Sequence, residues 1–204
     1  MKKEDFDYTD AWNEGELTLE YACVSGSERI VFIKAGLGGD YFGYENKYLR
    51  IAHLLHEKYG CTVVCVSNPH DKRFDVRADM DILNAVILRH GFQSPELYLF
   101  GNSNGCYKGL ALAQEMKFKR AVLVNMPMTI NFHRTKRFLM EIPQTEVLAV
   151  FGEKDISYPY AALLEGKRSG QSVLRIPDAD HQFIGKTEEF IRLAERLFET
   201  VNEK

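Results

Sequence analysis

Residues 96–105 read ELYLFGNSNG, an apolar strand-like run that leads directly into a serine flanked by glycines. A helical pattern over residues 104–116 follows at once. A serine held in a tight turn between a strand and a helix projects its hydroxyl away from the sheet, and the close packing there requires small residues two positions before and after it. Gly101 and Gly105 meet this requirement. The stretch therefore predicts a strand, a sharp turn that carries Ser103, and a helix.

Short β-branched or aromatic runs alternate with longer helical patterns along the chain, which is typical of a mostly parallel sheet with helices on both faces. The predicted strands cover residues 17–24, 29–34, 61–67, 96–100, 120–124, 146–151 and 172–176. The predicted helices cover residues 46–59, 75–90, 104–116, 160–168 and 186–202. Residues 25–28 read as a hairpin turn between the first two strands, and residues 125–143 as an irregular connection. We expect residues 1–204 to form a single α/β domain.

The composition is that of an ordinary globular protein, with 45% hydrophobic and 27% charged residues. The formal net charge is only −3 and the basic residues are dispersed, which argues against a nucleic-acid partner. The apolar runs are strand-sized, far shorter than the roughly 18 residues of a membrane helix, so we expect no membrane span. Acidic residues stand where the apolar part of an export signal would begin, so we expect a cytoplasmic protein. The composition leaves the oligomeric state open.

The cysteines lie in or beside apolar segments, at positions Cys23, Cys61, Cys65 and Cys106, and form no C-x-x-C pair. Cys61 and Cys65 share parity with Val63 on one predicted strand, so their side chains point to the same face of the sheet. Buried thiols that act as small hydrophobic side chains explain this pattern, and reduced thiols suit the cytosol. No cluster of histidines and carboxylates has the spacing of metal ligands, so we expect no metal site.

The motif G-x-S-x-G at residues 101–105 resembles the nucleophile elbow of the α/β-hydrolase family. The resemblance implies a carboxylate and a histidine farther along the chain, in that order, each on a loop after a late strand. Asp155 and His181 follow the last two predicted strands. Because ligand sites in open α/β sheets gather at the carboxyl ends of the strands, we expect these loops to meet. We predict a catalytic triad in which Ser103 is the nucleophile, His181 takes its proton and Asp155 orients the imidazole.

Other acidic residues and histidines compete for these roles. Glu153, Asp178 and Asp180 are alternatives to Asp155, but Glu153 comes earlier in its loop and the two aspartates stand almost beside His181. The remaining histidines do not follow a late strand, and we expect them at the surface or at the edge of the core. His53, His56 and His90 are predicted on helices, and His70 and His133 in loops.

Residues 35–40 read AGLGGD and resemble the family's H-G-x-x-G stretch, with Ala35 in place of the histidine. The resemblance implies that this loop supplies one oxyanion donor, the backbone N–H of Leu37. The other donor is the N–H of Asn104, because the free N–H groups at the start of the following helix face the space above the serine. The glycines do not predict a dinucleotide site, since a G-x-G-x-x-G motif would need glycine at Tyr41. We therefore expect no cofactor.

The connection over residues 125–145 is too short for the large lid that the family often inserts there. The resemblance therefore implies an open site without a cap domain. Candidates for an apolar wall that receives an acyl or small aromatic group are Tyr41, Phe42, Met126, Met128 and Phe183. Ordinary packing of these side chains in the core is the alternative interpretation.

The predicted triad transfers acyl groups in general, so its reaction type is better defined than its substrate. We expect a serine hydrolase that cleaves a small-molecule ester or thioester through an acyl-enzyme on Ser103. Cleavage of an amide or peptide bond by the same residues is a near alternative. A binding or scaffold protein that keeps the hydrolase fold without turnover is the alternative of a different class. The joint presence of Ser103, Asp155 and His181 argues against it.

Overall fold

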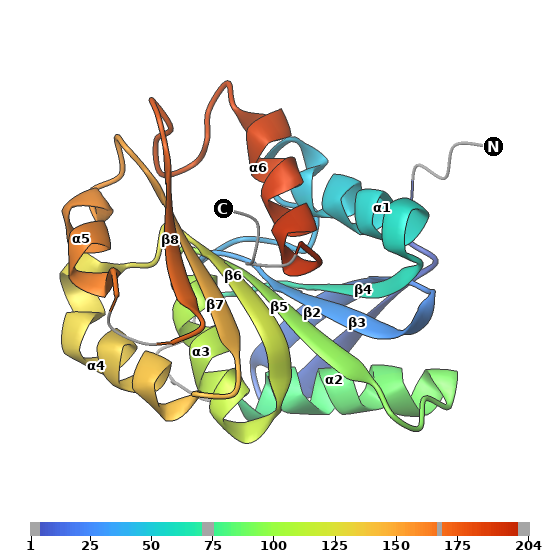
Figure 1. The fold of residues 1–204 in the computed structure, drawn as a ribbon. Helices are drawn as coiled ribbons and strands as arrows, with labels where there is room; N and C mark the ends of the chain where they lie inside the picture. Colours follow the sequence, from blue (N-terminus) through green and yellow to red (C-terminus); the bar gives the residue numbers. More distant parts are fainter. Residues whose placement is uncertain (1–4, 71–75, 167–168, 200–204) are drawn as a thin grey trace.

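The computed structural model describes residues 5–70, 76–166 and 169–199. These residues contain an eight-stranded sheet in the order β1-β2-β4-β3-β5-β6-β7-β8 (Figure 1). From β4 to β8 along this order the strands are parallel, whereas β1 and β2 pair in antiparallel fashion. The strands are β1 (Tyr8–Glu14), β2 (Leu17–Val24), β3 (Ser27–Lys34), β4 (Cys61–Val66), β5 (Glu96–Asn102), β6 (Phe118–Val124), β7 (Glu146–Gly152) and β8 (Gln171–Ile176). The prediction of an α/β fold with a mostly parallel sheet is confirmed.

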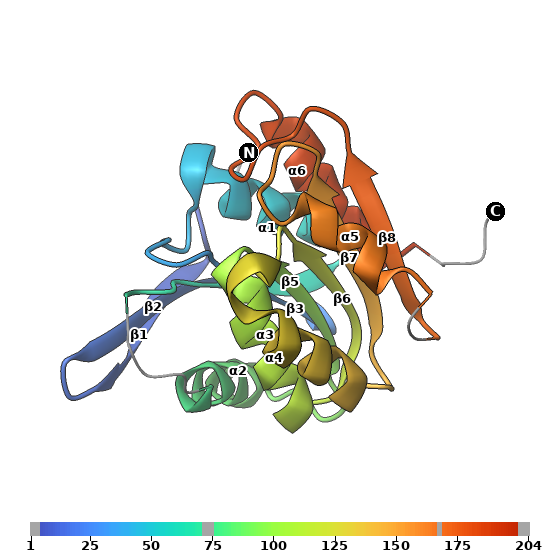
Figure 2. The same cartoon turned by 90° about the vertical axis from the view of Figure 1, so that its left-hand side faces the viewer.

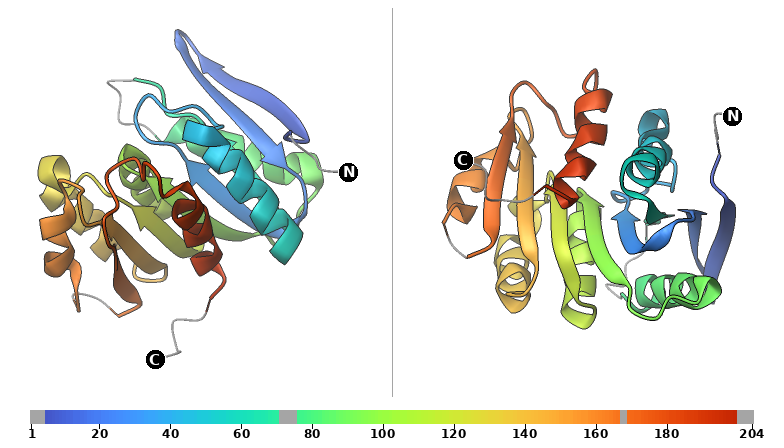
Figure 3. Two further views of the ribbon diagram at one scale, coloured as in Figure 1. Left: turned by 90° about the horizontal axis from the view of Figure 1, so that it is seen from above. Right: turned by 45° about the vertical axis from the view of Figure 1, so that its right-hand side comes forward.

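Helices cover both faces of the sheet (Figure 3). One face packs against α1 and α6, and the other against α2, α3, α4 and α5, so that each face has its own hydrophobic core. The helices are α1 (Lys47–Tyr59), α2 (Arg77–His90), α3 (Asn104–Glu115), α4 (Met128–Glu141), α5 (Ala161–Leu164) and α6 (Thr187–Leu193), with 3-10 turns η1 (Tyr44–Asn46), η2 (Tyr158–Tyr160) and η3 (Ala194–Leu197). Within the described residues, no helix combines the length and the apolar character that crossing a bilayer demands.

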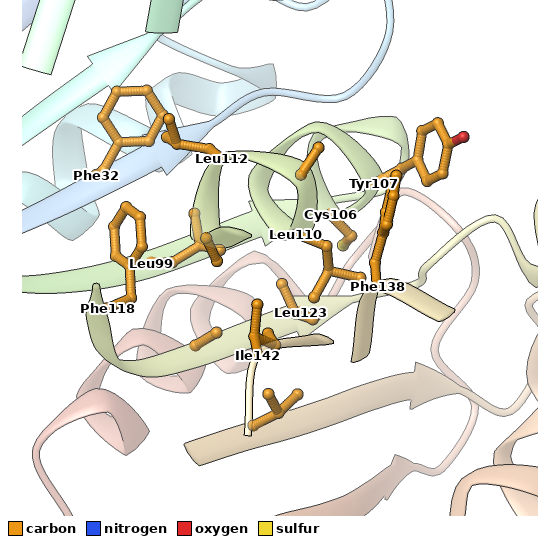
Figure 4. Packing of buried hydrophobic residues seen from close by; sticks show 14 of the residues in the cluster. Phe32, Leu99, Cys106, Tyr107, Leu110, Leu112, Phe118, Leu123, Phe138 and Ile142 are labelled. Carbon is orange, nitrogen blue, oxygen red and sulfur yellow. The ribbon is translucent and has the colours of Figure 1, made fainter. Parts of the chain in front are cut away.

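Helix α3 packs directly on the middle of the sheet and forms part of one hydrophobic core (Figure 4). Leu110 of this helix is fully buried together with Leu99 of β5 and Leu123 of β6. Burial of each such side chain contributes roughly 1.5–3 kcal/mol to stability. The ring of Tyr107 stacks on Phe138 of α4, with the ring centroids 5.4 Å apart. This packing fixes the start of α3 relative to the end of β5, where the predicted serine turn lies.

The first strands pair differently from the predicted hairpin over residues 17–34. β4 lies between β2 and β3, antiparallel to β2 and parallel to β3. The connecting Gly26 passes the start of β4, where its N–H donates to Thr62 Oγ1 at 2.9 Å and a Cβ would meet the Cys61 carbonyl oxygen at 2.4 Å. β2 instead forms a hairpin with β1, a strand that was not predicted (Figure 2). The hairpin prediction is wrong because β4, a strand distant in sequence, occupies the edge that a local turn would have paired.

Residues 125–143 are not irregular as predicted, because α4 fills most of this connection. The helix begins after Pro127 without a side-chain cap, so the usual sequence signal of a helix start is missing. Three other predicted helices differ at their ends: α2 begins at Arg77, α5 ends at Leu164 and α6 ends at Leu193. The predicted ends at residues 75, 168 and 202 lie outside the described residues.

Candidate active site

Ser103 lies in the sharp turn between β5 and α3, as its sequence position predicts. Its backbone has φ 52° and ψ −124°, a conformation that residues other than glycine rarely adopt. The Ser103 N–H donates to the Val124 carbonyl oxygen at 2.8 Å, which ties the turn to β6. The two flanking positions have no room for a side chain, so both must be glycine. A Cβ at Gly105 would lie 2.2 Å from a carbonyl oxygen of β3, and one at Gly101 would lie 2.8 Å from the Cα of Cys106.

The structure brings Ser103, His181 and Asp155 together at the carboxyl edge of the sheet. His181 Nε2 lies 2.9 Å from Ser103 Oγ, and His181 Nδ1 forms a hydrogen bond with Asp155 Oδ2. A carboxylate only accepts hydrogen bonds, so Nδ1 carries the ring proton and Nε2 is free to accept the proton of the hydroxyl. The side chain of Asp155 is fully buried, whereas that of His181 is 40% exposed. The imidazole is therefore open to a substrate while its carboxylate partner is shielded from water.

Asp155 is held by its own loop and by the neighbouring one. Its Oδ1 accepts the Ser157 N–H at 2.6 Å, and its N–H donates to the Gly152 carbonyl oxygen at 3.0 Å. Gly152 ends β7, and a Cβ there would lie 2.5 Å from the carbonyl oxygen of Ala179. The loop that carries Asp155 and the loop that carries His181 are therefore in backbone contact, which only glycine permits at this point.

The competing carboxylates have other partners. Glu153 accepts the Asp178 N–H at 3.1 Å, and Asp178 pairs with Lys154 at 2.9 Å. The Lys154 ammonium lowers the pKa of Asp178. Asp180 accepts two backbone N–H groups of its own loop at 3.0 Å. Within the described residues, none of the three bonds to the imidazole of His181.

The remaining histidines are placed mostly as predicted, with one correction. His53, His56 and His90 lie on helices. His133 lies on α4 and not in a loop, because the predicted irregular connection is that helix. His70 is in a loop, and its Nε2 would lie 2.6 Å from a Cβ built on Gly38. His70 thus packs against the oxyanion loop predicted at residues 35–40.

The predicted oxyanion donors are free to bind an anion. The backbone N–H groups of Leu37 and Asn104 have no acceptor among the described residues. The next N–H of the loop is occupied, since Gly38 donates to the Asn68 carbonyl oxygen at 2.7 Å. The N–H of Asn104 is the first of α3, where the helix dipole places positive partial charge. Free backbone donors beside a serine hydroxyl are the arrangement that a tetrahedral oxyanion requires.

Asn68, which was not predicted, holds the oxyanion loop against the elbow. Its Nδ2 donates to the Ala35 carbonyl oxygen at 3.0 Å and to Asn104 Oδ1 at 3.1 Å. This bridge ties the two parts together although Ala35 replaces the histidine of the family's motif. Asn68 could have been found in the sequence, because it follows a predicted strand at the same edge of the sheet.

Tyr48 of α1 forms a second tie that was not predicted. Its Oη accepts a hydrogen bond from Asn102 Nδ2 at 3.1 Å, which ties α1 to the end of β5. Burial raises the pKa of the Tyr48 hydroxyl, which therefore stays protonated. The sequence carried no signal for this role, because helical periodicity does not distinguish a core tyrosine from one that bonds to a loop.

Asn125, directly after β6, joins the loop that carries Asp155 to the loop that carries His181. The Gly152 N–H donates to Asn125 Oδ1 at 2.8 Å, and Asn125 Nδ2 faces the loop of His181. Nδ2 donates to the carbonyl oxygens of Asp180 and His181, both at 3.2 Å. Asn125 is fully buried and has φ 51°, a left-handed value that asparagine tolerates better than most residues. This side chain thus connects β6 to both loops.

A cavity of about 300 Å³ opens beside Ser103. Its walls come from the oxyanion loop, the start of α1, the elbow and the histidine loop: Gly36, Leu37, Gly38, Gly39, Gly43, Tyr44, Lys47, Tyr48, Asn102, Ser103, His181 and Gln182. A larger cavity of about 420 Å³ lies at the opposite edge, by the amino-terminal ends of the parallel strands. Of these two cavities, only the one beside Ser103 is lined by Ser103 and His181.

The residues predicted to form an apolar wall do not line this cavity. Met126, Met128 and Phe183 are at most 1% exposed and belong to the two hydrophobic cores. Tyr41 and Phe42 pack against each other, with ring centroids 4.6 Å apart. The structure therefore favours the alternative interpretation, in which these side chains pack in or against the core. Sequence periodicity does not separate the wall of a pocket from the interior, so the sequence left both interpretations open.

No model of a known protein family matches the chain, and no curated protein matches its sequence. Solved structures match it over nearly its whole length. An α/β serine hydrolase homologue from Coxiella burnetii superposes with a TM-score of 0.72 and 16% identity, covering 95% of this chain and 98% of that one. Dienelactone hydrolase from Anabaena variabilis ATCC 29413 superposes with a TM-score of 0.71 and 20% identity, covering 94% and 95%.

A third match is an α/β serine hydrolase without a lid from Xanthomonas campestris, with a TM-score of 0.63 and 17% identity, covering 95% of this chain and 96% of that one. At such low identity the likeness is one of architecture. It agrees with the single helix α4 in the place where a lid domain would be inserted. The chain therefore has the α/β-hydrolase fold, in the form that lacks a lid.

Proposed function

We propose that the protein is a serine hydrolase that cleaves a small ester or thioester through an acyl-enzyme on Ser103. The observation that carries the proposal is the unbroken hydrogen-bonded series from Asp155 through His181 to Ser103 Oγ. A serine hydroxyl is a weak nucleophile until an adjacent base removes its proton. The packing of the fold does not by itself require these three side chains to meet.

In the first half-reaction, Ser103 Oγ attacks the carbonyl carbon of the substrate while His181 Nε2 accepts the hydroxyl proton. The electron pair of the C=O bond moves onto its oxygen, and the N–H groups of Leu37 and Asn104 stabilise that charge. When the C=O bond re-forms, the bond to the leaving alcohol or thiol breaks and the imidazolium protonates it. Asp155 stabilises the imidazolium between these two proton transfers.

In the second half-reaction, a water molecule attacks the acyl carbon and His181 Nε2 accepts its proton. The oxyanion forms at the same donors, and its collapse breaks the bond to Ser103 Oγ. The imidazolium returns the proton to this oxygen, which releases a carboxylic acid and restores the starting state. The partial exposure of His181 gives water access to the acyl carbon.

The structural neighbours support this function over a binding role. Those reported above carry the description of hydrolase or hydrolase homologue. A shared fold alone does not establish an activity, because the same architecture carries many functions. The proposal therefore depends on the triad geometry, with the neighbours as secondary support.

A fluorophosphonate probe tests the nucleophile, because it phosphonylates an activated serine. We expect one probe per wild-type chain, measured by intact-protein mass spectrometry, with the modified peptide containing Ser103. Ser103→Ala should lose the label. Ser94→Ala removes an exposed serine elsewhere and should keep it. Labelling that persists in Ser103→Ala, or no labelling of the wild type, would contradict the mechanism and favour a non-catalytic binding role.

A substrate panel with a common acyl group separates the reaction classes. We expect hydrolysis of p-nitrophenyl esters and of the matching thioester, and slower hydrolysis of the matching anilide. A faster reaction with the anilide would favour the amidase or peptidase alternative. Because the leaving group is the only variable, such a result would change the substrate class and leave the roles of the triad intact.

A further inference from the structure

Lys47 is the first residue of α1 and lines the cavity beside Ser103. It is only 3% exposed, which is unusual for a lysine. No sequence pattern distinguishes it from an ordinary surface lysine. Its position places a long cationic side chain in the wall of the proposed active site.

The ammonium of Lys47 has no carboxylate partner in the described part of the chain. Two aromatic rings stabilise its charge: Nζ lies 4.1 Å from the ring centroid of Phe190 and 5.5 Å from that of Tyr48. Lys34 shows the usual arrangement for a buried lysine, with Nζ bonded to Asp79 Oδ1 at 2.6 Å and to a backbone carbonyl oxygen at 2.8 Å. A cation without such a partner is costly to bury. A buried, unpaired lysine beside a cavity therefore indicates that a bound ligand supplies the negative charge.

The other walls of the cavity carry no opposing charge. Among its lining residues there is no aspartate or glutamate, and the polar groups are amides, hydroxyls and the imidazole of His181. Burial lowers the pKa of Lys47 to about 8, so most of the population is still protonated at neutral pH. The cavity beside the nucleophile is therefore a small, positively charged compartment.

We propose that the substrate carries a carboxylate on its acyl part and that Lys47 binds it. The acyl part is the relevant one because it stays attached to Ser103 Oγ through both half-reactions and so occupies the adjoining cavity. A single lysine matches a single negative charge, which favours a carboxylate over a phosphate dianion. This inference rests on the proposed hydrolase function and narrows it to small esters of dicarboxylic acids.

The kinetic test compares two esters that differ in one charge, mono-p-nitrophenyl adipate and its methyl ester. The ratio of their kcat/KM values is measured within each variant, after subtraction of spontaneous hydrolysis. We expect the wild type to prefer the carboxylate ester by about 10- to 100-fold, the range of one charge-assisted contact. Lys47→Met should reduce this ratio to about 1, mainly through KM. Arg50→Met removes an exposed cation from the same helix and should leave the ratio unchanged.

A binding test gives a result that does not require turnover. Ser103→Ala protein is titrated with monomethyl adipate and with dimethyl adipate by calorimetry, and again in the background of Lys47→Met. We expect the monoanion to bind more tightly than the neutral diester, and the difference to vanish without Lys47. Circular dichroism establishes that each variant is folded, and Lys47→Gln serves as a second neutral variant.

The outcomes separate the two proposals. Equal kcat/KM values for both esters in the wild type, with labelling by the fluorophosphonate, would overturn the role of Lys47 and leave the hydrolase standing. No hydrolysis and no labelling, with charge-dependent binding that disappears in Lys47→Met, would overturn the hydrolase and support an anion site. Equal binding of the two ligands in both backgrounds would overturn the anion site whatever the kinetics show.

Discussion

At the scale of single residues, backbone strain and hydrogen bonding set the position of the Ser103 hydroxyl. Its left-handed φ of 52° holds Oγ at the tip of the turn, where His181 Nε2 lies 2.9 Å away. A conformation of this kind costs on the order of 1–3 kcal/mol and persists only where the surroundings impose it. Here the surroundings are the two glycines of the elbow and the hydrogen bond to β6.

Asp155→Asn should lower kcat by about 10³- to 10⁴-fold with a smaller change in KM. The amide can donate to His181 Nδ1, which would place the ring proton on Nε2, where it no longer accepts from Ser103 Oγ. The measurement is steady-state hydrolysis of a p-nitrophenyl ester. Glu153→Gln changes an exposed carboxylate of the same loop and serves as the control. A loss in Glu153→Gln as large as that in Asp155→Asn would contradict the assignment of the acid.

Lys47→Met should raise the free energy of unfolding at pH 7. The folded state lowers the pKa of Lys47 from 10.5 to about 8, which corresponds to a penalty on the order of 3 kcal/mol below pH 8. Below pH 8 Lys47 is protonated in both the folded and the unfolded protein, so the full penalty applies. It declines as pH rises from about 8 to 10.5 and is absent above, where both states are neutral. Urea unfolding of both proteins at pH 7 and pH 10.5 checks this, and an equal difference at both values would contradict it.

At the scale of elements, the site depends on how closely α3 approaches the ends of β3 and β5. Gly105 lies against the backbone of β3, and Gly109 lies one turn later against Leu99. The first contact is with a carbonyl oxygen that cannot move without disturbing the sheet, and the second is with a side chain. A side chain at Gly105 would therefore be harder to accommodate than one at Gly109, although both glycines belong to the same helix.

Gly105→Ala should destabilise the fold by about 3 kcal/mol or more, because its Cβ would lie 2.2 Å from the Lys34 carbonyl oxygen. Gly109→Ala should cost only about 1–2 kcal/mol. Its Cβ would lie 2.9 Å from the Cδ atoms of Leu99, and alanine also favours the helix. Urea unfolding monitored by circular dichroism gives both values. If the two substitutions had equal effects, the close contact of the elbow with β3 would not be the cause of the glycine requirement.

At the scale of the whole molecule, the two hydrophobic cores take up all four cysteines. Cys61 and Cys65 lie in one core with Val63, as their shared parity predicts. Burial raises the pKa of the thiols of Cys23 and Cys61 to about 11, and those of Cys65 and Cys106 rise as well. Iodoacetamide reacts with the thiolate form of cysteine, and thiols with a raised pKa form little thiolate near neutral pH.

We therefore expect the folded protein to resist iodoacetamide at pH 7.5 and to keep the proposed esterase activity. The same treatment in urea should modify all four thiols, as counted by mass spectrometry. Rapid modification of the folded protein with loss of activity would indicate a reactive cysteine beside the site. This outcome would contradict the assignment of the nucleophile to Ser103.

The sequence predicted the parts of the fold that depend on local patterns. The elbow was predictable because glycine spacing and the strand-to-helix change are features of neighbouring residues. The pairing of β2 with β4 was not, because it depends on a strand that enters the sheet from farther along the chain. The sequence did not predict helix α4, because its start carries no cap signal and its packing against α3 is a contact between distant segments.

By itself, the sequence determined the fold class, the turn that carries Ser103, and the candidates for its acid and base, because the order of strands and loops along the chain follows from local residue patterns. Only the tertiary structure decided which side chains meet. It bonded Asp155 to His181, joined the predicted oxyanion loop to the turn of Ser103 through Asn68, and buried Lys47 in the wall of the cavity beside Ser103. These outcomes depend on the relative positions of segments far apart in sequence, which are set by the packing of two cores on one sheet and not by any local pattern.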